Sequence, residues 1–155
     1  MPVRSLRTTI LLGTETRSID RWGRIKIWAA MPSAASAGES RAGHVLTGRR
    51  AGCLTLYPSS EWKRVESRLR GLSAGDEGRP FVRALLADAC RVTVDARGRI
   101  TIPRALLTRA GLGRRATLLG MADHLEIWNP GRLRRKLAQV EPEVGRLAQE
   151  VLGEE

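Results

Sequence analysis

A ten-residue motif that occurs twice constrains the fold of this chain more than any other feature of its sequence. Residues 18–27 read Ser-Ile-Asp-Arg-Trp-Gly-Arg-Ile-Lys-Ile, and residues 93–102 read Thr-Val-Asp-Ala-Arg-Gly-Arg-Ile-Thr-Ile. Five of the ten positions are identical, and the second copy begins 75 positions after the first in a chain of 155 residues. Because a repeat of this length marks a duplicated structural unit, the sequence predicts two similar halves, each with an Asp-x-x-Gly-Arg turn.

The size of each half predicts that the two halves do not fold separately. A unit of about 75 residues is close to the size at which a lone hydrophobic core becomes marginal. Hydrophobic residues make up 42% of the chain, which is ordinary for a globular protein. We therefore expect the halves to pack together, or to share their cores between chains.

The charge of the chain is strongly positive. There are 27 Lys and Arg residues against 16 Asp and Glu, which gives a net charge of +11 and an isoelectric point near 11.3. A GC-rich genome would explain why arginine outnumbers lysine, but it would not explain the excess of positive charge. The balance favours a polyanionic partner, above all nucleic acid.

Several function classes are disfavoured by what the sequence contains. Cys53 and Cys90 form no Cys-x-x-Cys motif, so we expect reduced thiols and no cysteine-based zinc site. His44 and His124 have no Ser, Cys or carboxylate at a useful catalytic spacing, and phosphate-binding glycine loops and His-Glu-x-x-His are absent. We expect no enzyme activity, no catalytic residues, no cofactor and no metal. No stretch is apolar enough to span a membrane and no signal peptide is recognisable, so a cytoplasmic protein is expected.

Alternating polar and apolar residues predict strands, and longer periods predict helices. Strands are expected at residues 9–12, 14–20, 24–28, 44–47, 53–57, 91–95, 99–102, 116–119 and 125–128. The strand at 24–28 is expected to return beside 14–20 as a hairpin around Gly23, which tolerates a positive φ. Residues 32–43 are expected to form a short helix or a loop, and residues 73–80 a linker. Residues 81–90 are expected to enter the second unit as a strand or a short helix.

Helix-start signals occur at three places. Ser59 or Ser60 is expected to cap one helix, Pro103 to occupy the first position of another, and Asn129 to cap the last one before Pro130. Apolar residues of the last helix recur at spacings of four and three, which forms a narrow stripe. The stripe comprises Leu133, Leu137, Val140, Val144, Leu147 and Val151. It indicates either a seam with a partner chain or a helix that covers its own domain; Pro142 is expected to kink or restart it.

These motifs and their order resemble the MraZ proteins of bacteria, over nearly the whole chain. The resemblance rests on Asp-x-x-Gly-Arg-Ile-x-Ile in both units and on Ile102-Pro103 after the second copy. It also rests on residues 53–62, on Leu-Leu-Gly at 118–120 and on Glu-Ile-Trp at 126–128. A single Asp-x-x-Gly-Arg would be weak evidence, whereas its duplication with these intervening segments is specific.

The resemblance implies an α+β fold, mainly β, in which two tandem swapped-hairpin units of the AbrB and SpoVT type form one pseudo-two-fold domain. We expect an arm and first strand at 1–13, the first unit at 14–62, a helix and linker at 63–88, the second unit at 89–132, and a C-terminal helix at 133–155. The implied function is a nucleoid-associated transcriptional regulator, expected to be a repressor. It would bind direct repeats in the promoter of a division and cell-wall gene cluster that includes its own gene. The implied assembly is a ring of identical subunits.

Carried over by position, the DNA-contacting arginines are Arg24 and Arg99, with Asp20 and Asp95 as their partners within each motif. Arginine suits this role because its guanidinium fork meets O6 and N7 of guanine together. We expect each Asp to orient its arginine, or to serve as an ordinary turn residue. The turns are supported by Gly23 and Gly98. Candidates for phosphate contacts are Arg21, Lys26, Arg97, Arg49 and Arg50; for the last two a solvated loop is the alternative.

The first unit departs from the family pattern. Trp22 stands where a basic residue is usual, and Trp28 where proline is usual. The first turn is therefore expected either to bind more weakly or to use Trp22 and Arg21 differently. Trp22 would stack on DNA or pack against a neighbouring subunit, whereas Trp62 and Trp128 are expected in the core.

Two other DNA-binding interpretations remain. One is an antitoxin-like DNA binder of the same fold, which the duplication disfavours because such antitoxins usually carry one unit. The other is a basic nucleoid-associated protein without sequence specificity.

Overall fold

The computed structural model describes residues 12–27 and 43–153 and shows an α+β protein built around antiparallel strands. The first half contributes β1 (Thr14–Ser18), β2 (Arg24–Lys26), β3 (His44–Arg50) and β4 (Cys53–Tyr57). The second contributes β5 (Cys90–Val92), β6 (Arg99–Thr101), β7 (Arg115–Gly120) and β8 (Leu125–Trp128). The helices are α2 (Ser59–Ser73), α3 (Arg79–Ala87), α4 (Arg104–Arg109) and α5 (Pro130–Leu152).

The two halves exchange strands. A six-stranded sheet has the order β1-β7-β8-β4-β3-β5, and a two-stranded sheet pairs β2 with β6. Interchanging the halves maps β1 onto β5, β3 onto β7 and β4 onto β8, and leaves this order unchanged. The fold is therefore a pseudo-two-fold arrangement of two swapped units, as the family resemblance implies.

One local expectation is wrong. The strand after the first turn does not return beside β1 as a simple hairpin, because β2 pairs with β6 of the other half and only a single bridge joins Ile19 to Ile25. In each of these short strands the central isoleucine faces the core, whereas the residues on either side of it are more exposed. Ile25 and Ile100 are cross-strand partners and are both fully buried.

One hydrophobic core serves both halves. Its members come from both copies of the repeat and from the long strands, and they include Ile25, Ile27, Ile100 and Ile102 together with Leu46, Leu54, Leu56, Leu118 and Ile127. The expected core positions of Trp62 and Trp128 are confirmed, since both are buried. A shared core is what two units of marginal size require.

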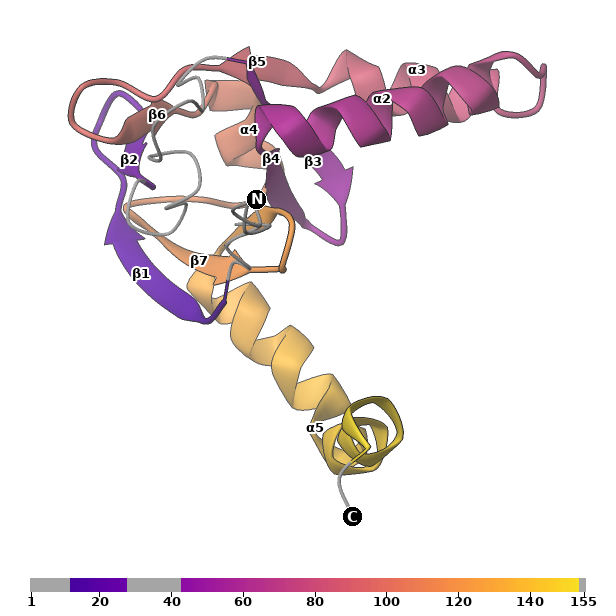
Figure 1. The fold of residues 1–155 in the computed structure, drawn as a ribbon. Helices are drawn as coiled ribbons and strands as arrows, with labels where there is room; N and C mark the ends of the chain where they lie inside the picture. The colour runs from indigo at the N-terminus through magenta and orange to yellow at the C-terminus, as the bar shows by residue number, and fades with distance from the viewer. Residues whose placement is uncertain (1–11, 28–42, 154–155) are drawn as a thin grey trace, which may run out of the picture.

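The helices leave the strands in different directions (Figure 1). The neighbouring helices α2 and α3 project together on one side, and α5 runs away on another. The turns β1–β2 and β5–β6 lie together on the side opposite α2 and α3. The two Asp-x-x-Gly-Arg turns are therefore not covered by α2, α3 or α5.

Helix starts differ in detail from the sequence expectation. Pro58 is the N-cap of α2 and no side chain caps it, so Ser59 is the first helical residue and not the cap. Pro103 is likewise the N-cap of α4 and not its first residue. Asn129 caps α5 as expected, accepting hydrogen bonds from the amides of Gly131 and Arg132. Pro142 lies inside α5, and Figure 1 shows the helix axis changing direction in its second half.

The linker region forms more helix than expected. Residues 79–87 are α3, so the helical alternative for this segment is confirmed and the turn between α2 and α3 is short. Most of the segment at 32–43, expected as a helix or a loop, and the strand expected at 9–12 lie outside the described residues, as does Trp28. Among the helices that the structure describes, none is long and apolar enough to cross a membrane.

Candidate nucleic-acid interface

The two Asp-x-x-Gly-Arg turns have the same hydrogen-bond geometry. Asp20 Oδ1 accepts from the amides of Trp22 (3.0 Å) and Arg24 (2.9 Å), and Asp20 Oδ2 accepts from Arg24 Nε (2.6 Å). In the second turn Asp95 Oδ1 accepts from the amides of Arg97 and Arg99 (both 2.9 Å), and its Oδ2 accepts from Arg99 Nε (2.9 Å). Each aspartate therefore closes its turn and also fixes the plane of its arginine.

The charge state of both aspartates follows from these bonds. The hydrogen bond from the Arg99 amide is the largest influence on Asp95, and with the Arg99 side chain it lowers the pKa below the ordinary value. Desolvation raises the pKa of Asp20, but hydrogen bonds from Arg24 and Trp22 outweigh it, so that pKa is lowered as well. Both carboxylates are ionised at neutral pH and present a charged acceptor to the arginine beside them.

Each turn is tied to the other half of the protein. The amide of Ile102 donates to the Gly23 carbonyl (2.8 Å), and the amide of Ile27 donates to the Gly98 carbonyl (2.9 Å). Both glycines have a positive φ, +82° at Gly23 and +77° at Gly98. The turns are thereby held side by side as one rigid edge.

The strands that follow the turns carry cations on one two-stranded ribbon. Lys26 is opposite Arg99 in the β2–β6 register, and Arg24 is opposite Thr101. Like charges directly opposite each other destabilise a sheet. The ion pair between Arg99 and Asp95 offsets part of this repulsion within the protein.

The first turn differs from the second in the residue at its tip. Trp22 is 57% exposed, and its ring lies 4.1 Å from the guanidinium carbon of Arg21 and 4.6 Å from that of Arg24. Stacking of guanidinium groups on an indole is favourable. Arg24 is therefore held by both a carboxylate and an aromatic ring, whereas the corresponding tip residue of the second turn is the exposed Arg97.

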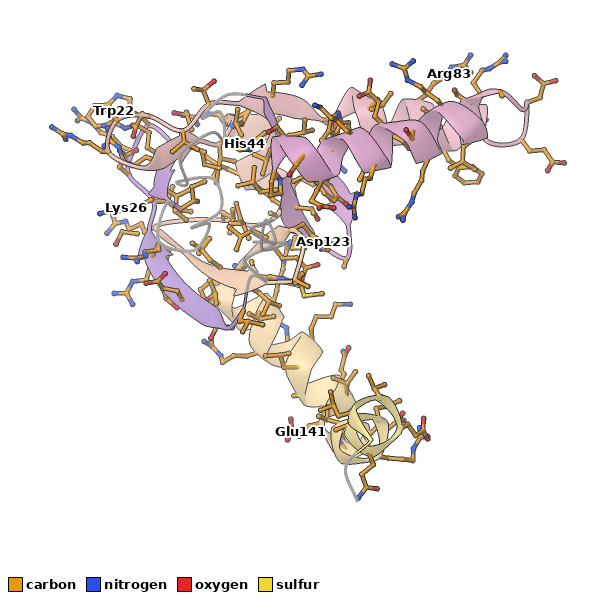
Figure 2. The ribbon with its side chains drawn as sticks, in the orientation of Figure 1. Trp22, Lys26, His44, Arg83, Asp123 and Glu141 are labelled. Atoms are coloured by element: carbon orange, nitrogen blue, oxygen red, sulfur yellow. The ribbon has the colours of Figure 1, made fainter. Side chains whose placement is uncertain are left out.

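The remaining phosphate candidates are placed differently. Arg49 and Arg50 end strand β3 and do not lie in a loop, and their side chains are outside the description. Figure 2 shows Trp22 and Lys26 on the side of the molecule away from Asp123 and Glu141. The structure thus brings Arg21, Arg24, Lys26, Arg97 and Arg99 to one edge.

Both histidines are hydrogen-bonded within the fold, and Cys53 is buried. His44 is fully buried in β3, where its Nδ1 accepts from the Ser59 amide (3.1 Å). His124 Nδ1 lies 2.6 Å from Oδ1 of its sequence neighbour Asp123, at an exposed site. Burial, reinforced by Glu126, raises the pKa of Cys53 to about 12, so its thiol is protonated at neutral pH. Within the described residues no His, Cys, Asp and Glu side chains gather in a group able to hold a metal ion.

Sequence reasoning missed one feature beside the first turn. A hollow of about 900 Å³ lies between this turn, α4 and the start of β7, and its rim includes Arg104, Arg114 and Arg115. No local signal reveals it, because its walls come from two stretches that are distant in sequence, 18–23 and 102–115. The tertiary structure brings the first turn beside the stretch that carries the three arginines.

Replacing Asp95 by alanine tests the orienting role. Removing a carboxylate makes the protein more positive, so electrostatics alone would tighten DNA binding. If Asp95 orients Arg99, affinity instead falls by about tenfold, because about 1–3 kcal/mol of charged hydrogen bonding to the turn is lost. Fluorescence anisotropy with labelled promoter DNA measures the change. Asp76→Ala, at an almost fully exposed site between α2 and α3, is the matched control. Binding as tight as that of the parent would show that Asp95 has no such role.

The chain is similar to one family of known proteins. A family model described as "MraZ protein, putative antitoxin-like" matches residues 85–143, which include the second turn. The transcriptional regulator MraZ of Thermomicrobium roseum is 38% identical over 78% of this chain and 82% of its own length. The regulator of the same name from Bifidobacterium longum is 30% identical over 94% of each chain, and that of Pediococcus pentosaceus is 36% identical over 65% of this chain and 71% of its own.

Proposed function

This chain belongs to the MraZ family of transcriptional regulators, and from that premise we propose that it recognises promoter DNA through its two Asp–Arg turns. The observation that carries the proposal is the matched pair of turns, which present Arg24 and Arg99 from one rigid edge. A two-stranded ribbon fits the major groove, where arginine reads guanine. Arg21, Lys26 and Arg97 would hold the phosphates on either side.

The finer parts of the proposal rest on the family resemblance. The DNA sites would be direct repeats in the promoter of a division and cell-wall gene cluster that includes the protein's own gene, and the protein would act there as a repressor. The two units at 14–62 and 89–132 would together form one DNA-binding domain. The helix and linker at 63–88 join them, the arm and first strand at 1–13 precede them, and the C-terminal helix at 133–155 follows them. Several copies in a ring would engage successive repeats, and this multivalency raises affinity without new contacts. The protein would then reside with the nucleoid in the cytoplasm.

Three alternatives to the proposal are an enzyme, an antitoxin-like DNA binder and a non-specific basic protein. The relatives described above are named as regulators and not as enzymes. An antitoxin-like protein of this fold would need a partner toxin, and a non-specific basic protein would bind all DNA alike. The duplication within one chain disfavours the antitoxin, and a non-specific binder does not need two arginines fixed in the same geometry.

Fluorescence anisotropy over a salt series tests the proposal. DNA from upstream of the protein's own operon is compared with scrambled DNA of equal length. We expect the promoter to bind at least about 10³-fold more tightly, which is the lower end for specific recognition. Log affinity should fall with log salt by about 0.9 for each phosphate contacted. Equal binding of both DNAs, lost as salt rises, would replace this proposal with the non-specific basic protein.

A further inference from the structure

The hollow beside the first turn has an apolar floor and a basic rim. Ile102, Leu107 and Leu112 line it from α4 and its flanks, and Leu107 and Leu112 pack on the core while staying partly exposed. The exposed side chains of Arg104, Arg114 and Arg115 lie around it. A volume of about 900 Å³ is in the upper part of the range of binding clefts in proteins.

The rim charges have no acidic partner among the residues that the structure describes. The carboxylate that lines the hollow is Asp20, which is already bonded to Arg24. No described carboxylate forms an ion pair with Arg104, Arg114 or Arg115. The hollow therefore fits a partner that combines apolar side chains with carboxylates.

The same chain carries a surface of that complementary kind on α5. Leu133 in the first turn is buried, but the rest of the stripe is exposed to between 42% and 78%: Leu137, Val140, Val144, Leu147 and Val151. The first half of α5 is basic, with Arg132, Arg134, Arg135 and Lys136, whereas carboxylates flank the stripe in the second half, at Glu141, Glu143 and Glu150. The complementary surface is therefore the second half of the helix. Arg146 pairs with Glu143 and Glu150, whereas Glu141 forms no ion pair with any described residue.

The hollow and the exposed part of α5 do not meet within one chain. Figure 1 shows α5 running away from the side that carries the β1–β2 turn. Figure 2 places Glu141 far along this helix and Trp22 at the opposite edge of the molecule. The 23 residues of α5 rise about 34 Å along a helix axis that changes direction in its second half.

We infer that α5 of one copy docks in the hollow of the next copy. The apolar stripe would cover the floor, and Glu141 would face the arginines of the rim. This inference rests on the self-association within the proposed function and names the two surfaces that perform it. Because the surfaces differ, the contact is head-to-tail, and repetition of such a contact closes into a ring when its rotation permits.

The docked helix would also lie against the first DNA-reading turn. Arg21 and Trp22 line the same hollow. Assembly would therefore cover part of Trp22 and limit the positions that Arg24 can take. It would thereby change the surroundings of the first turn, whose Asp20–Arg24 bonds are already formed in the single chain, whereas the second turn lies outside this contact.

Mixing two assembly-defective variants tests the inference. The hollow variant carries Arg114→Glu and Arg115→Glu, and the helix variant carries Val144→Arg and Leu147→Arg. The matched control carries Arg68→Glu and Arg83→Glu, which make the same charge change at exposed positions of α2 and α3. Native mass spectrometry and light scattering measure the assembly of each full-length protein, and circular dichroism checks its fold.

We expect the parent and the control to assemble and each variant alone to be monomeric. An equimolar mixture of the two variants should form 1:1 dimers and nothing larger, since one intact hollow and one intact helix remain. Dimer formation would also show that both variants fold. Assembly of the hollow variant alone, or no dimer in the mixture, would overturn the docking and leave self-association standing. A monomeric parent would overturn both, while the promoter-binding experiment would judge DNA recognition separately.

Discussion

Replacing Arg99 by alanine is expected to remove most of the preference for promoter DNA over scrambled DNA. A bidentate arginine–guanine contact is worth about 1–3 kcal/mol of discrimination, or roughly 5- to 150-fold per site. The loss should multiply when several subunits bind together. Promoter and scrambled affinities, measured by anisotropy at fixed salt, give the ratio.

Three further variants isolate the cause of that loss. Arg99→Lys keeps the charge but loses the planar fork, so it should lose discrimination almost as fully. Arg83→Ala removes the same charge on α3 and should leave the ratio unchanged. Arg24→Ala shows whether the first turn takes part, and a fall as large as that of Arg99→Ala would mean that both turns read bases. An unchanged ratio in Arg99→Ala would contradict the assignment of Arg99.

Replacing Gly23 by alanine is expected to destabilise the fold by about 2–4 kcal/mol, the combined cost of a left-handed backbone and a backbone clash. Gly23 has φ +82°, and an added Cβ would lie 2.6 Å from the carbonyl oxygen of Ile102. The clash is with backbone, and it falls where the amide of Ile102 donates to the Gly23 carbonyl. The tie between the two halves must therefore shift or break. Urea denaturation followed by circular dichroism measures the change.

Gly52 provides the control for backbone strain alone. It has the same φ of +82°, but nothing lies within 4 Å of an added Cβ. Gly52→Ala should therefore cost about 1 kcal/mol, and the difference between the variants measures the clash. Equal destabilisation by both substitutions would mean that the backbone at Ile102 moves away from the added Cβ with no loss of folding free energy.

The two turns share a geometry but not a surface chemistry. The guanidinium groups of Arg21 and Arg24 lie over the Trp22 ring, while Arg97 places an exposed cation at the same position of the second turn. The sequence left open whether the first turn was weakened by its tryptophan. The structure shows that Asp20 and Arg24 retain the full bonding pattern, and it places Trp22 beside the hollow proposed to receive a neighbouring helix.

Much of the fold could be predicted because the sequence repeats. The duplicated motif predicted two halves, and the resemblance built on it supplied the swapped arrangement that the sheet order confirms. The positions of Trp62, Trp128 and the Asn129 cap followed from local patterns. Local patterns failed where the partner was distant: the hairpin expected around Gly23 gave way to pairing between β2 and β6.

The sequence by itself determined the local chemistry of the turns. Asp, Gly and Arg at fixed spacing dictate which amides the carboxylate accepts and where a positive φ is needed, since these contacts span at most four residues. The tertiary structure alone decided which residues of different elements lie next to each other. It set Lys26 opposite Arg99, placed the first turn beside residues 102–115 to form one hollow, and left the stripe of α5 exposed. Such contacts join residues far apart in the chain, and their geometry depends on how the two halves exchange strands and bury one core.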